Sequence, residues 1–189
     1  MFIYSRVIFF SLFFLAPCLS CHSADAIDKE TDSVLVMPFA DLAQPSGASD
    51  KVTDMFAREL VKAGGYRVYH PQLVRKYLSG RKDHLENSGS SEEAIKTAKT
   101  FGARYVISGI ITEYDGFPPF SLDISVEMFD VESRERLSAD SISRAGQSVW
   151  QRLAPFTKKQ TMDQYVRDVC AQLITRSFEK KVPAKNYKQ

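Results

Sequence analysis

Apolar and polar positions in the first half of the chain follow strand-like and helix-like spacings in turn. Residues 34–37 form a short continuous apolar run that ends at a proline, which is typical of a buried strand. A loop follows, and apolar side chains then recur at helical spacing up to residue 63. Ser49 or Asp50 is the expected cap at the start of this helix, and Gly64-Gly65 is its expected end.

A second strand and two further helical segments follow. Residues 66–69 form the strand, and Pro71 opens the first helical segment. The polar segment 79–90 is expected to be an exposed loop. The next helix begins at Ser90 or Ser91 and ends at a glycine; two acids occupy its first turn, where the helix dipole favours negative charge.

The second half of the chain is dominated by strands. Residues 104–111 are apolar on both faces, as expected of a central strand. Residues 121–130 alternate between apolar and polar side chains, which predicts a half-buried strand, and residues 136–146 return as its antiparallel partner. The last long element, residues 161–178, has apolar positions at helical spacing and should pack on one face of the sheet.

This order of elements predicts an α/β (α+β) fold, a small mixed β-sheet of about five strands with helices packed on it. Residues 33–179 are expected to form a single domain, since their number suits one hydrophobic core. Residues 22–32 are polar and lack any period, which favours a flexible tether. Residues 180–189 form a basic tail that is expected to be disordered.

Composition and the N-terminus narrow the possible functions. The chain has 189 residues, and its net charge of +2 gives no general reason to expect nucleic acid as a partner. Arg6 precedes a short apolar run over residues 7–16, which is the pattern of an export signal. Ordinary signal cleavage would follow Ala26. No apolar stretch after that point reaches the length of about 20 residues that spans a bilayer.

The segment CLSCH after the apolar run admits three interpretations. C-x-x-C-H is the attachment motif of a c-type haem, with His22 as an axial ligand. Cys21 also suits a lipid acceptor, with residues 1–21 as a lipoprotein signal; Cys18 is the alternative acceptor, although Pro17 precedes it. In the third interpretation, both cysteines are simply removed with the signal. Because no fold precedes the motif to enclose a haem, lipidation of Cys21 is favoured and no cofactor is expected.

Few side chains suggest catalysis. Cys170 lies on the apolar side of the last helix, where a buried and inert thiol is expected. Asp123, Ser125 and Glu127 alternate along one strand, which indicates a solvated face rather than an acid–base pair. The three histidines have neither a closely placed acid nor metal-ligand spacing. We therefore expect no catalytic residues and no metal site.

Four segments carry a family resemblance, in this order: VLVMPFADL, VTDMFARELVKAGGYRVY, AKTFGARYVISGIITEYDG and LDISVEMFDVESRERLSADS. They resemble the periplasmic domain shared by the curli-secretion channel subunit, the penicillin-binding-protein activator lipoproteins and the amino-terminal domain of the Tol-system propeller protein. The similarity covers about residues 33–147, most of a domain of ordinary size.

The resemblance implies an anticodon-binding-like or Tol N-terminal-domain-like fold and a non-enzymatic accessory function at the cell envelope. Many such proteins are outer-membrane lipoproteins. Two departures are visible in this chain. The usual Thr-Gly of the last turn is here Ser133-Arg134, and there is no room for the extra membrane-inserting hairpins of the curli channel, which argues against a pore.

Trp150 and Phe156 follow the last strand and are candidate contacts with a protein partner, or else pack on the core. The sequence thus predicts an exported accessory lipoprotein on the periplasmic side of the bacterial outer membrane. It would meet the membrane through Cys21 and act on an envelope protein. The alternative is a soluble periplasmic subunit of a secretion, flagellar or Tol-like system. The enzymatic alternative is a haem or thiol redox protein.

Overall fold

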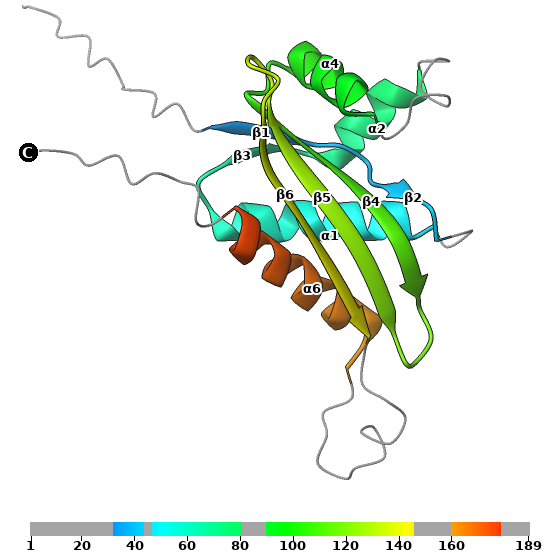
Figure 1. Ribbon diagram of the computed structural model, residues 1–189. Helices are drawn as coiled ribbons and strands as arrows, with labels where there is room; N and C mark the ends of the chain where they lie inside the picture. Colours follow the sequence, from blue (N-terminus) through cyan, green and yellow to red (C-terminus); the bar gives the residue numbers. More distant parts are fainter. Residues whose placement is uncertain (1–31, 44–46, 81–89, 146–159, 179–189) are drawn as a thin grey trace, which may run out of the picture.

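The computed structural model describes residues 32–43, 47–80, 90–145 and 160–178 of the chain, which form a six-stranded sheet with helices packed on it (Figure 1). The strands are β1 (Ser33–Val36), β2 (Ala40–Asp41), β3 (Arg67–Tyr69), β4 (Tyr105–Asp115), β5 (Ser121–Asp130) and β6 (Arg136–Ala145). The helices are α1 (Ala48–Ala63), α2 (Pro71–Ser79), α4 (Ser91–Phe101) and α6 (Met162–Ser177).

The sheet is mixed. Its strand order is β3-β1-β4-β5-β6, and the two-residue β2 pairs with β4 beyond the end of β1. β1 runs parallel to both of its neighbours, while β4, β5 and β6 form an antiparallel meander. This arrangement confirms the α/β (α+β) fold expected from the sequence. The strand expected at 104–111 continues to Asp115, and β2 was not expected because two residues carry no periodic signal.

Helices α1 and α6 cover one face of the sheet (Figure 1). Phe56 of α1 lies at its centre, with ring centroids 5.3 Å from Phe39 and 6.1 Å from Phe178, both edge to face. A salt bridge of 2.7 Å between Lys51 and Asp163 joins the N-terminal ends of the two helices. This face carries the larger of the two hydrophobic cores, and its contacts hold α6 against the sheet.

Helices α2 and α4 cover the opposite face only at the end where β1 lies (Figure 1). There they bury a second, smaller core that includes Leu35, Val74, Ala98, Val106 and Phe129. The rest of that face, over β4, β5 and β6, carries no helix among the described residues. The sheet therefore has one fully covered face and one that is covered at a single end.

The helix ends follow capping rules, with one correction. α1 begins after Gly47, so Ser49 and Asp50 lie inside its first turn and neither is the cap. The Ser49 hydroxyl instead donates to the carbonyl oxygen of Phe39 at 2.6 Å, because the chain folds back there. Ser90 caps α4 by accepting a hydrogen bond from the Glu93 N–H at 3.2 Å, which confirms that expectation.

Candidate interaction surface

The described residues contain no group of three or more His, Cys, Asp or Glu side chains placed to hold a metal ion. Cys170 is fully buried on α6, and burial raises the pKa of its thiol, so the protonated, unreactive form dominates at neutral pH. His70 lies at the start of α2, where its Nδ1 accepts a hydrogen bond from the Gln72 N–H at 3.3 Å. Each of these groups has a structural role.

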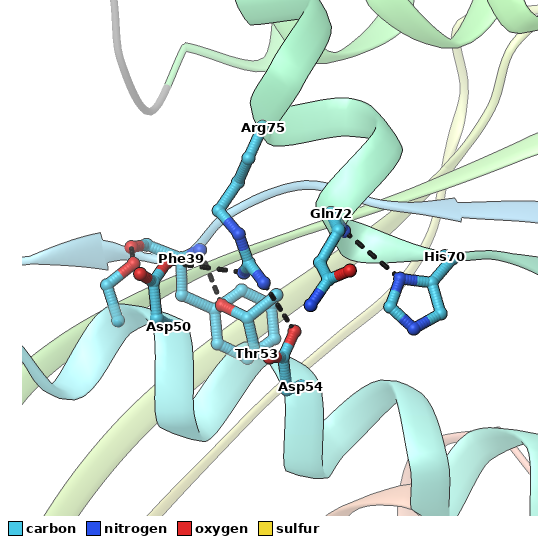
Figure 2. A network of polar contacts seen from close by, with 8 residues as sticks. Phe39, Asp50, Thr53, Asp54, His70, Gln72 and Arg75 are labelled. Carbon is cyan, nitrogen blue, oxygen red and sulfur yellow. Dashed lines mark hydrogen bonds and ion pairs between the residues drawn. The ribbon is translucent and has the colours of Figure 1, made fainter. Parts of the chain in front are cut away.

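A polar network joins α1, α2 and the chain after β1 (Figure 2). Arg75 of α2 points toward α1, where its Nη2 donates to Asp54 at 2.8 Å and its Nη1 lies 3.2 Å from an oxygen of Asp50. The fully buried Thr53 hydroxyl accepts the N–H of Phe39 at 3.0 Å. Arg75 thus ties α2 to α1, although its buried Nη1 has no hydrogen-bond partner among the described residues and lies only at ion-pair distance from Asp50.

The N-terminal segment enters the domain at one end of the sheet. The Arg104 guanidinium donates to the Asp32 carboxylate at 2.6 Å. The backbone N–H of Arg104 donates to the Ser33 hydroxyl oxygen at 3.1 Å. The Arg67 N–H donates to the Asp32 carbonyl oxygen at 3.0 Å. These three contacts hold Asp32 and Ser33, the start of the described segment, against Arg67 and Arg104.

A hairpin lies at the other end of the sheet, between β4 and β5, and we call residues 116–120 the hairpin tip (Figure 1). Phe117 is 81% exposed there, and its N–H donates to the Asp115 carboxylate at 2.8 Å. Pro118 and Pro119 follow directly, so the backbone at the tip has little freedom. A large apolar side chain is thus held in solvent by a locally ordered turn.

The uncovered part of the sheet forms a second exposed area, which we call the open face. Its side chains are mostly small or polar: Ser108, Ile110, Asp123, Ser125, Glu127, Ala139, Ser141 and Ser143. At its border Arg136 pairs with Glu127 at 2.8 Å. The polar strand face that the sequence predicted at Asp123, Ser125 and Glu127 therefore lies here, half-buried among neighbouring strands.

β6 forms a free edge, because within the described residues it pairs only with β5. It is ten residues long, whereas β3 at the opposite edge has three. A hollow of about 440 Å³ runs beside its first half, between β6 and the end of α6. In that hollow Asp140 accepts hydrogen bonds from Arg176 at 2.8 Å and from the Ser177 hydroxyl at 2.7 Å.

The turn between β5 and β6 is built around Asp130. Its carboxylate accepts the N–H groups of Ser133 and Glu132, each at 2.9 Å. The hydrogen bond from the Ser133 N–H is the main cause that lowers the pKa of Asp130 below its ordinary value. Arg134, next in the turn, has a φ of 61°, in the left-handed region that favours glycine.

The predicted site residues fall outside the described part of the chain. Cys21 and Cys18 precede Asp32, and Trp150 and Phe156 lie between Ala145 and Gln160. Ala145 pairs with Ser121, so β6 ends beside the hairpin tip. The structure neither supports nor contradicts the roles predicted for these four residues.

Sequence reasoning did not single out the hairpin tip or the free edge of β6. The string DGFPP has the composition of a turn, and the phenylalanine inside it is the available signal. The free edge had no signal, because neighbours in a sheet are set by topology rather than by any local pattern of residues.

The sequence matches no family model and no curated protein. Its fold, however, is found in solved structures. Lipoprotein GNA1162 from Neisseria meningitidis aligns with a TM-score of 0.55 and 17% identity, over 78% of this chain and 99% of that one. The PelC dodecamer from Paraburkholderia phytofirmans aligns with a TM-score of 0.52 and 16% identity, over 76% of this chain and 86% of that one. At such identities the likeness establishes the fold alone.

Proposed function

We propose that this protein is an exported, non-enzymatic accessory of a cell-envelope machine, anchored to the membrane by a lipid on Cys21 and acting through protein–protein contacts. The observation that carries the proposal is the placement of the anchor side and the hairpin tip at opposite ends of one strand. Val34 pairs with Tyr105, the first residue of β4, and the hairpin tip follows Asp115, its last residue.

The length of β4 turns this placement into a distance. Ten residue steps in an extended strand separate its ends by about 33 Å. Between Cys21 and Asp32 the chain can span at most about 38 Å when fully extended. A domain attached through Cys21 could thus present the hairpin tip well away from the membrane surface, toward a partner protein.

The surface near the tip also favours a protein partner. Glu113 and Asp115 precede the tip, Asp123 lies on the adjoining strand, and Arg144 of β6 pairs with Leu122 at the same end of the sheet, so charges of both signs lie near the exposed Phe117. An apolar protein pocket with a charged rim would accept such a surface. Aromatic side chains that enter pockets supply much of the energy of many interfaces.

The structural neighbours are compatible with this function. GNA1162 is a lipoprotein, and PelC was crystallised as a dodecamer. A protein with this fold can therefore be lipidated, and a protein with this fold can assemble with copies of itself. Neither observation names a partner for this chain.

Membrane fractionation tests the anchor. We expect the wild-type chain in the membrane fraction and the Cys21→Ser variant in the soluble fraction. Cys18→Ser is the matched control, because it changes the same residue type three positions earlier and should leave the protein on the membrane. A Cys21→Ser chain that stays in the membrane fraction, or a wild-type chain that is soluble, would contradict the anchor and favour the soluble periplasmic subunit.

A further inference from the structure

The first and last described residues of the domain, Asp32 and Phe178, lie at the same end of the sheet. The Asp32 carbonyl oxygen accepts the N–H of Arg67 at 3.0 Å. Tyr66, the neighbour of Arg67 in the chain, lines an apolar hollow of about 140 Å³ together with Phe178. The start of β1 and the end of α6 therefore lie near each other (Figure 1).

Helix α6 runs from the hairpin tip toward this end. Near its start, the Tyr165 ring lies 5.8 Å from the ring of Phe120 in the hairpin tip. Near its end, the Ser177 carbonyl oxygen accepts the Ser138 hydroxyl at 3.3 Å, in the first half of β6. Phe178 thus lies at the end of the domain that is opposite to the hairpin tip.

The basic tail, residues 180–189, follows Phe178 closely in the chain. It contains four lysines and neither Asp nor Glu: Lys180, Lys181, Lys185 and Lys188. The whole chain has a net charge of only +2, so the rest of the chain is net negative. The excess positive charge of the protein is therefore concentrated in this segment.

The folded surface beside Asp32 does not account for this charge. A hollow of about 640 Å³ is lined there by Lys99 and Arg104 and by three acids, Asp32, Asp130 and Glu132. Two of the acids already have partners. Asp32 accepts the Arg104 guanidinium at 2.6 Å, and the Asp130 carboxylate accepts the Glu132 N–H at 2.9 Å. This hollow offers little uncompensated negative charge to four lysines, which favours a partner outside the chain.

The position of the tail indicates which anionic partner it would meet. Ten residue steps separate Lys188 from Phe178, so the tail can reach at most about 35 Å from the end of α6. The proposed lipid on Cys21 is attached to the same end of the domain through Asp32. An anionic lipid surface near that lipid would thus be within reach of the lysines, and each lysine close to such a surface strengthens binding about fivefold.

We propose that the basic tail binds the anionic phospholipid head groups of the membrane in which the lipid anchor is held. The domain would then have two attachments at one end, which directs the hairpin tip away from the membrane. This arrangement rests on the proposed function for the anchor at Cys21. The binding of the tail to anionic lipid does not require that anchor.

Co-sedimentation with lipid vesicles tests the binding. The full-length chain with Cys21→Ser lacks the proposed lipid acceptor, so it reports on the tail separately from the anchor. We expect it to sediment with vesicles of phosphatidylcholine and phosphatidylglycerol more than with phosphatidylcholine alone. The difference should disappear at about 1 M NaCl, because salt screens exposed charges.

Paired substitutions assign the binding to the tail. Lys185→Gln with Lys188→Gln, in the same Cys21→Ser chain, should lower the affinity for the anionic vesicles about tenfold. Arg58→Gln with Lys96→Gln is the matched control, because it removes two exposed positive charges from α1 and α4. It should lower the affinity less than about twofold. Lys185→Arg with Lys188→Arg keeps the charge and should bind as before.

The proposal is overturned if the tail and control substitutions weaken binding equally, or if the Cys21→Ser chain shows no preference for anionic vesicles. It is also overturned if that chain sediments with isolated peptidoglycan and not with the vesicles. Failure of the anchor has a different signature. A wild-type chain without a lipid on Cys21, whose tail still binds anionic vesicles, would contradict the anchor and the two-point attachment but support lipid binding by the tail.

Discussion

At the scale of single residues, the partner contact proposed for the exposed Phe117 can be tested directly. Its ring is outside the core, so Phe117→Ser should change the free energy of unfolding by less than about 0.5 kcal/mol.

A photo-crosslinking residue at position 117 should capture an envelope protein in cells. The same residue at Val61, which is 58% exposed on α1, is the control and should capture far less. Equal capture at both positions would contradict a partner site at the hairpin tip.

Arg134 shows how one departure from the sequence pattern that the chain otherwise resembles appears in the backbone. The turn that usually carries Thr-Gly has Ser133-Arg134 here, and Arg134 takes the left-handed conformation. A residue with a side chain is strained in that region by about 1 kcal/mol. Arg134→Gly should therefore raise the free energy of unfolding by about that amount, measured by urea denaturation. Arg134→Ala keeps a side chain and should give no such gain; equal gains from both variants would rule out backbone strain as the cause.

At the scale of elements, the packing of the Phe39 ring against β4 depends on one glycine. A Cβ atom on Gly109 would lie 2.7 Å from the Phe39 ring, closer than packed atoms tolerate. We expect Gly109→Ala to destabilise the protein by about 1–3 kcal/mol, because the ring must move within the core. Gly80→Ala, where the nearest atom is 3.6 Å away, should be nearly neutral. A Gly109→Ala variant as stable as Gly80→Ala would contradict this packing.

The elements themselves were largely predictable from the sequence, because each depends on local pattern. The helical spacing in α1 and α6, the Ser90 cap and the alternation in β5 all involve neighbours in the chain. The start of α1 was not predicted correctly. Ser49 looks like a cap by residue type, yet it is used in a bond to Phe39, ten residues earlier, and such a contact has no local signal.

The candidate surface was harder to predict because it is defined by what the helices do not cover. The sequence indicated that Asp123, Ser125 and Glu127 face water, and the structure agrees. It did not indicate that α2 and α4 cover only one end of that face, or that β6 lies at an edge. Both facts follow from strand order, which arises from long-range pairing.

At the scale of the whole molecule, the domain has two distinct ends. Asp32 and Arg104 hold the entering chain at one end, and the exposed Phe117 lies at the other. No helix among the described residues is long and apolar enough to cross a membrane. In the proposed function the N-terminal segment holds the domain at the membrane and leaves the hairpin tip free for a partner.

The most direct measurement is the intact mass of the mature protein from its native envelope, together with the sequence and mass of its N-terminal peptide. Our account predicts a peptide that begins at Cys21 and carries fatty acyl groups. An unmodified start near Ile27 would contradict the anchor, because both N-terminal cysteines would then have been removed. A haem adduct on residues 18–22 would contradict the non-enzymatic function as well.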